Sequence, residues 1–151
     1  MPMTQIVEKR LTGERALFMA QDIHIKNCLF ADGESPLKES HSLLIENSSF
    51  QWKYPLWYSS NIKVIGCTFF AMARAGIWYT KNISLEDCLY EAPKGFRRVE
   101  GLFVKGVNFP QAQETLWNCS DVSLENVSVH GDYFAMNCTN LQAKNLNLSG
   151  N

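Results

Sequence analysis

A block of nine residues recurs along the chain at a spacing that fits one short coil of backbone per copy. The first copy is DIHIKNCLF at residues 22–30. The copies begin at Asp22, Ser42, Asn61, Asn82, Gly101, Asp121 and Asn140. Consecutive copies are therefore 19 to 21 residues apart. Helical repeats need about 33 to 47 residues per unit, so this period predicts coils of single strands rather than pairs of helices.

Two positions of the block are apolar in every copy, while the residues between them vary. The second position holds Ile23, Leu43, Ile62, Ile83, Leu102, Val122 and Leu141. The fourth position holds Ile25, Ile45, Val64, Leu85, Val104, Leu124 and Ala143. This alternation indicates a strand with one buried face. Because one coil cannot cover its own inward face, the coils are expected to stack.

Two further columns predict the shape of each coil. The sixth position holds Asn27, Asn47, Gly66, Asp87, Gly106, Asn126 and Asn145. These residue types tolerate left-handed backbone, so we expect a tight corner there, with stacked asparagines bonding along the axis. The ninth position holds Phe30, Phe50, Phe69, Tyr90, Phe109, Val129 and Leu148. It predicts an aromatic stack inside the coil.

The columns together predict an all-β fold, a parallel β-helix of about seven rungs, with residues 1–151 in a single domain. Residues 1–21 are expected to form an N-terminal capping strand and the first rung. Residues 140–151 are expected to form a last rung without a cap. The open edge of that rung predicts a homo-oligomer that pairs through it.

Composition narrows the classes of partner. The net charge of −1 predicts neither nucleic acid nor an anionic membrane as a partner. No apolar run approaches the roughly 20 residues that span a bilayer, and the N-terminal MPMTQIVEKR does not resemble a secretory signal. The five cysteines show no zinc-binding spacing. They predict reduced core thiols in a cytoplasmic protein, without a metal site or a cofactor.

A second strand precedes each block, and its outward columns carry aromatic and basic side chains. Four residues before the blocks stand Phe18, Lys38, Trp57, Trp78, Arg97, Trp117 and Met136. The next outward column holds Met19, Glu39, Tyr58, Tyr79, Arg98, Asn118 and Asn137. Exposed aromatic rings gathered on one face mark a binding surface. We interpret this face as a shallow site for an oligosaccharide or polysaccharide, formed by Trp57, Tyr58, Trp78, Tyr79, Arg97, Arg98 and Trp117.

Candidates for catalysis lie beside this face, but they do not define a reaction. A lyase needs a base next to the carbon that it deprotonates, and Arg97 and Lys94 are the candidates. A hydrolase needs two carboxylates, for which Glu14, Glu34 and Glu114 are the candidates. Whether the protein is an enzyme therefore stays open.

The sequence also allows a different interpretation of the same residues. The segments Phe70–Gly76 and Glu91–Gly95 can fold over Trp57, Trp78 and Trp117, which then form a second, minor core. The charged columns are in that case an ordinary solvated surface. The protein is then a non-catalytic structural or interaction module that oligomerises through its open C-terminal end.

Several segments of the chain resemble one known family. They are GERALF at Gly13, GESPLKES at Gly33, WKYPLWYS at Trp52, ARAGIWY at Ala73, APKGFRR at Ala92, ETLWNC at Glu114 and GDYFAMNC at Gly131. The chain looks like a member of the pectin-lyase-like family catalogued as domain of unknown function 3737. The resemblance covers nearly the whole chain and implies a right-handed, single-stranded β-helix, with more coils in most members. It supplies no activity, substrate or catalytic residue.

Overall fold

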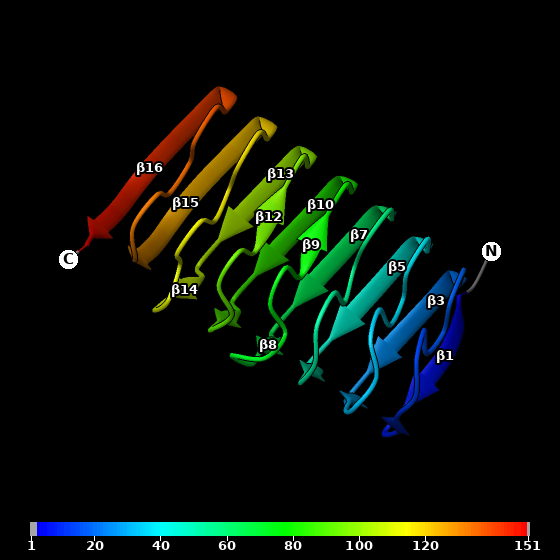
Figure 1. Cartoon of the computed structure of the whole chain (residues 1–151). Coiled ribbons are helices and arrows are strands. Elements are labelled where there is room, and N and C mark those ends of the chain that lie inside the picture. The colour runs from blue at the N-terminus through cyan, green and yellow to red at the C-terminus, as the bar shows by residue number, and fades with distance from the viewer. Residues whose placement is uncertain (1–2, 151) are drawn as a thin grey trace.

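The long strands of successive turns lie side by side in one parallel sheet (Figure 1). The computed structural model describes residues 3–150. The long strands are β1 (Thr4–Val7), β3 (Gln21–Lys26), β5 (His41–Glu46), β7 (Ser60–Ile65), β10 (Lys81–Glu86), β13 (Glu100–Lys105), β15 (Ser120–His130) and β16 (Thr139–Ser149). Each pairs in parallel with the long strand of the next turn. The described residues therefore form a parallel β-solenoid of about eight turns.

Shorter strands complete the other sides of the coil. After the corner come β2 (Arg10–Leu11), β4 (Leu29–Phe30), β6 (Ser49–Phe50), β8 (Thr68–Phe69), β11 (Leu89–Tyr90) and β14 (Asn108–Phe109). In the last two turns this path is part of β15 and β16. Before the long strands, β9 (Ile77–Trp78) and β12 (Phe96–Arg97) form a separate two-stranded parallel sheet. No helix occurs among residues 3–150, and so none there is long and apolar enough to cross a membrane.

The register confirms that each column of the repeat is a line along the molecule. Leu85, for example, lies opposite Val64 on one side and Val104 on the other. All three side chains are fully buried. The interior of the coil is therefore a continuous apolar core, built by stacking equivalent residues of successive turns.

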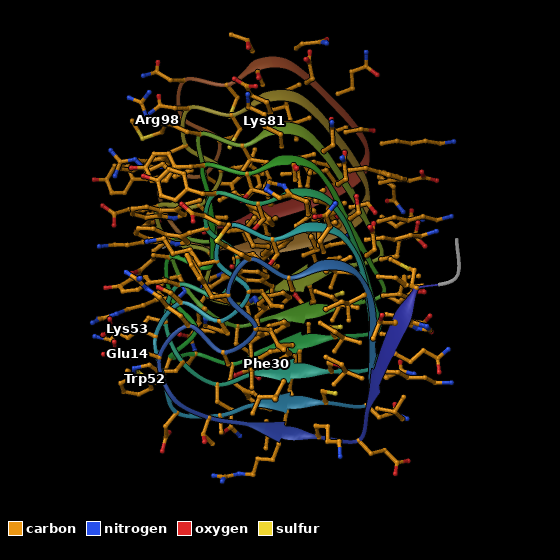
Figure 2. All side chains as sticks on the ribbon, turned by 90° about the vertical axis from the view of Figure 1, so that its right-hand side faces the viewer. Glu14, Phe30, Trp52, Lys53, Lys81 and Arg98 are labelled. Atoms are coloured by element: carbon orange, nitrogen blue, oxygen red, sulfur yellow. The ribbon has the colours of Figure 1, made fainter. Side chains whose placement is uncertain are left out.

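The ninth column forms the predicted aromatic stack. Phe30, Phe50 and Phe69 lie parallel, with ring centroids 4.7 and 4.8 Å apart, and Phe69 stacks on Tyr90 at 4.6 Å. Figure 2 shows Phe30 inside the coil. The Tyr90 hydroxyl donates to Gly95 O at 3.4 Å. Complete burial raises the pKa of Tyr90, so the phenol stays protonated.

The sixth column forms the predicted corner. Every residue in it has positive φ, from 48° at Asn47 to 65° at Gly66. The first column of the block, from Asp22 to Asn140, has positive φ as well, which the sequence pattern did not predict. Asparagine bonds link neighbouring turns at both corners, as between Asn145 Nδ2 and Asn126 Oδ1 at 2.7 Å.

One turn more than the seven predicted is present. Residues 4–11 pair with β3 and β4 as an additional turn, and its corner is Glu8, with φ of 54°. Thr4 lies opposite Ile23 in this turn, so a polar residue stands where the repeat is apolar. That substitution concealed the turn in the sequence. Residues 1, 2 and 151 of the predicted domain lie outside the described residues.

The cysteines are free and mostly buried. Cys28, Cys67, Cys88 and Cys119 are buried, and Cys138 is half-buried. Loss of hydration on burial raises the pKa of Cys67 and of Cys119 to about 12, although backbone hydrogen bonds oppose the shift. These two thiols are therefore protonated core fillers at neutral pH.

Candidate functional site: an aromatic and basic strip

The predicted binding residues lie on one side of the solenoid, which we call the strip. It consists of Trp57, Tyr58, Trp78, Tyr79, Arg97, Arg98 and Trp117. Strands β9 and β12 form its middle. Their residues Ile77 and Phe96 are fully buried, and the next residues, Trp78 and Arg97, are half-buried at the surface. Figure 2 shows Arg98 on the same outer side as Trp52 and Lys53.

Four of the five aromatic rings of the strip form two stacks. Trp57 and Trp78 are nearly parallel, with centroids 5.1 Å apart and planes at 7°. Tyr58 and Tyr79 form a second stack at 4.9 Å and 11°. Because these rings cover each other's faces, mainly their edges are available to a ligand. The sequence allowed either a fully exposed tryptophan surface or a minor core covered by loops. The tryptophans are half-buried, so their exposure is intermediate between these two alternatives.

Each tryptophan of the strip is fixed to the next turn by its indole N–H. Trp78 donates to Lys94 O at 2.8 Å, and Trp117 donates to Tyr133 O at 2.7 Å. Trp57 donates to the equivalent carbonyl, Ala75 O. A side chain held by both stacking and a hydrogen bond has little rotational freedom, so the strip is a rigid surface.

Arg97 occupies a tryptophan position of this column. Its guanidinium carbon lies 5.2 Å from the centre of the Trp78 ring, which is a cation–π contact. Its backbone bridges to Trp117 of the following turn. Its Nε atom is buried and has no hydrogen-bond partner among residues 3–150. Such an unsatisfied donor requires an explanation.

A small pocket surrounds Arg97. It has a volume of about 110 Å³ and is lined by Trp78, Lys94, Arg97, Glu114 and Trp117. Two of these lining residues form an ion pair, with Lys94 Nζ 3.3 Å from Glu114 Oε2. The structure thus brings together three of the five predicted candidates for catalysis, Lys94, Arg97 and Glu114, and two of the predicted aromatic residues.

The other predicted residues lie apart from the pocket. Arg98 is exposed and does not line it, although it belongs to the same turn. Glu14 and Glu34 precede β3 and β5, whereas the residues that line the pocket precede β10, β13 and β15. Glu34 is instead paired with Lys53 at 3.4 Å. A two-carboxylate arrangement is therefore not formed, because Glu114 is the one carboxylate among the lining residues.

The aromatic surface extends further than the sequence analysis predicted. Tyr54 packs against Trp57, with centroids 4.8 Å apart. The Lys53 ammonium lies 5.6 Å from the centre of Trp52 and 5.8 Å from that of Tyr54. These residues fall outside the two outward columns, but the local segment WKYPLWYS contains the signal, since four of its eight residues are aromatic.

Comparisons with known proteins identify the family. No curated protein matches the chain. A crystal structure of a putative glycosyl hydrolase from Parabacteroides merdae ATCC 43184 is similar over 97% of this chain and 81% of that one, with 8% identity and a TM-score of 0.35. That likeness is too weak to assign an activity. A family model matches residues 4–151, so the chain belongs to the family described as protein of unknown function DUF3737.

Proposed function

We propose that the protein binds an oligosaccharide on the strip, with the pocket beside Arg97 at the centre of the site. The observation that supports this is the composition of the pocket. Two indole side chains line it together with an ammonium, a guanidinium and a carboxylate. Sugars present C–H groups to aromatic rings and hydroxyls to polar groups. A pocket lined by both aromatic and charged side chains therefore suits a sugar.

Binding is a better match for the geometry than turnover. Glycoside hydrolysis by the common route uses two carboxylates, and the pocket supplies one. Lys94 is engaged by Glu114, so neither is free to act as a general base without breaking their ion pair. We therefore propose a binding role and no reaction.

The stacked rings also set the form of the site. A sugar cannot lie flat between Trp57 and Trp78, because these rings already contact each other at 5.1 Å. The ligand is expected to run across the ring edges, with one unit placed at the pocket. We expect modest affinity, because edge contacts bury less apolar surface than contacts with a ring face.

Tryptophan substitutions test this proposal. Trp117→Phe removes the indole that lines the pocket, whereas Trp52→Phe removes an indole that does not line it. Affinity for neutral and acidic oligosaccharides is measured by calorimetry, with melting temperatures as a control for folding. We expect Trp117→Phe to weaken binding about tenfold, which is about 1.4 kcal/mol, and Trp52→Phe to have little effect. Absence of binding to any oligosaccharide at millimolar concentration, or equal losses in the two variants, would contradict the proposal.

A second candidate function is association through the last turn, between two copies of this chain. The inward residues Leu141 and Leu148 are 39% and 60% exposed, whereas their counterparts Val122 and Val129 in the preceding turn are 2% and 3% exposed. Pairing of two β16 edges would cover this apolar surface. Light scattering over a range of concentrations measures the state of the chain. We expect a dimer that Leu148→Glu dissociates, and a wild-type monomer at every concentration would exclude this function.

A further inference from the structure

The guanidinium of Arg97 lies against an indole ring and has N–H groups without a protein partner. Its carbon is 5.2 Å from the centre of the Trp78 ring, a cation–π contact. Its Nε atom is buried without a partner, and no ion pair among residues 3–150 includes Arg97. Nε is covered by protein atoms, whereas the two terminal nitrogens form no hydrogen bond among residues 3–150, so their outer N–H groups are a pair of parallel donors without a protein acceptor.

We propose that Arg97 is the centre of an oxyanion subsite, which holds a planar carboxylate of the ligand through its two terminal nitrogens. Two parallel N–H groups match the two oxygens of a carboxylate, and charge-assisted bonds of this kind are stronger than neutral ones.

The pocket has the size and charge for such a group. Its volume of about 110 Å³ is well below the roughly 300–1,000 Å³ of sites that enclose a whole small molecule, so it holds a substituent. Lys94, Arg97 and Glu114 together carry a formal charge of 2 − 1 = +1. The Lys94 ammonium lies beside Glu114 and offsets its charge, so that carboxylate does not prevent an anion from entering.

The inference rests on the proposed function, since it names the ligand as an acidic oligosaccharide whose carboxylate enters the pocket. A free small carboxylic acid shares this chemistry. The two sources are distinguished by comparing an oligogalacturonide, the same oligomer with its carboxyl groups reduced to alcohols, and acetate.

The test observes the arginine Nε–Hε groups of the full chain by ¹H–¹⁵N NMR during titration with the three probes. Arg97→Lys identifies the Arg97 signal and retains the charge while removing the paired donors. Lys38 occupies the equivalent place two turns before Trp78, so a lysine is compatible with this column. Arg10→Gln, on β2 and outside both the strip and the pocket, controls for general loss of positive charge.

We expect the acidic oligomer to shift the Arg97 Nε–Hε signal and to leave the Arg10 signal in place. We expect Arg97→Lys to weaken binding of the acidic oligomer about tenfold or more, corresponding to loss of one charge-assisted hydrogen bond. The reduced oligomer should bind Arg97→Lys and the wild type equally, and Arg10→Gln should change binding less than about threefold.

The outcomes separate this inference from the proposed function. If both oligomers bind but Arg97→Lys affects neither, the carbohydrate site stands and the oxyanion subsite is refuted. If acetate shifts the Arg97 signal while neither oligomer binds, the subsite stands and the carbohydrate function is refuted. If no probe shifts the Arg97 signal, the subsite is refuted whatever the oligomers do.

Discussion

The substitution Gly76→Ala places a methyl group where the phenol of Tyr90 lies. The new carbon would be 2.1 Å from Tyr90 Oη and 3.3 Å from Cζ. The phenol would have to move, although its ring is packed between Phe69 and Phe109. The companion substitution Tyr90→Phe removes the oxygen and keeps the ring. Gly76→Ala should therefore be tolerated much better in the Tyr90→Phe background.

The distances set the size of the effect. Inserting a methyl group into a packed core costs ~1–3 kcal/mol. A displaced phenol also loses its bond to Gly95 O, which contributes ~1 kcal/mol. Tyr90→Phe loses only that bond, because Gly95 O still accepts from the Ile77 N–H at 2.8 Å. Without the hydroxyl, the nearest atoms are Ala73 O at 3.1 Å and ring Cζ at 3.3 Å, so shifts of a few tenths of an ångström suffice.

We therefore expect the two substitutions to be coupled by ~1–2 kcal/mol in their free energies of unfolding. Urea unfolding of the wild type, both single variants and the double variant measures the coupling. Gly95→Ala is the matched control, because a methyl there meets Tyr90 Cε1 at 3.0 Å and Cζ at 3.2 Å, and phenylalanine keeps both carbons. Additive costs for Gly76→Ala and Tyr90→Phe, or equal rescue of both glycine variants by Tyr90→Phe, would refute the reasoning.

Two further predictions concern the corners and the buried thiols. Asn47 has a φ of 48°, in the left-handed region that alanine disfavours, so Asn47→Ala should lower the free energy of unfolding by ~1–2 kcal/mol. Asn47→Gly should lower it less, because glycine adopts this conformation readily, and thermal unfolding measures both variants. Burial raises the pKa of Cys67 and Cys119 from 9.0 to about 12, so the folded state retains protons that the unfolded state releases. Stability is therefore expected to be constant below about pH 8 and to fall between about pH 9 and 12, less steeply in Cys67→Ala; denaturant unfolding across this range measures it.

Aligning the copies of the repeat predicted much of the fold, because equivalent residues of successive turns stack in register. The apolar columns, the aromatic stack and the sixth-column corner are repeated in nearly every turn, so each copy supports the others. Features that occur in one turn alone could not be predicted from the repeat. Gly76 and Gly95 make room for the hydroxyl of Tyr90, but they lie in connections between the columns. Residues 1–21 were predicted to contain a capping strand, but the complete turn at residues 4–11 was not recognised because Thr4 stands at an apolar position.

The site was only partly accessible from the sequence for a different reason. The columns placed Trp78, Arg97 and Trp117 in one line and Lys94 and Glu114 next to them, which is where the pocket lies. They did not reveal that tryptophan rings would cover one another, because that depends on side-chain rotamers. Nor did they reveal that each indole would donate to the following turn, which fixes those rotamers.

Arg97 stands at a position that is tryptophan in the turns on both sides of it. Replacing it with tryptophan is the strongest test of why the pocket exists. Arg97→Trp would place an indole between Trp78 and Trp117, with its N–H near the carbonyl of Glu114, as in the other turns. We expect this variant to be at least as stable as the wild type, since it removes the unsatisfied Nε and adds ring stacking. It should also fill the pocket and abolish selective binding of an acidic oligosaccharide. A stable variant that loses binding would mean that arginine at this position trades stability for recognition. A destabilised variant would mean that Arg97 is required by the fold, and the pocket would then be a consequence of packing.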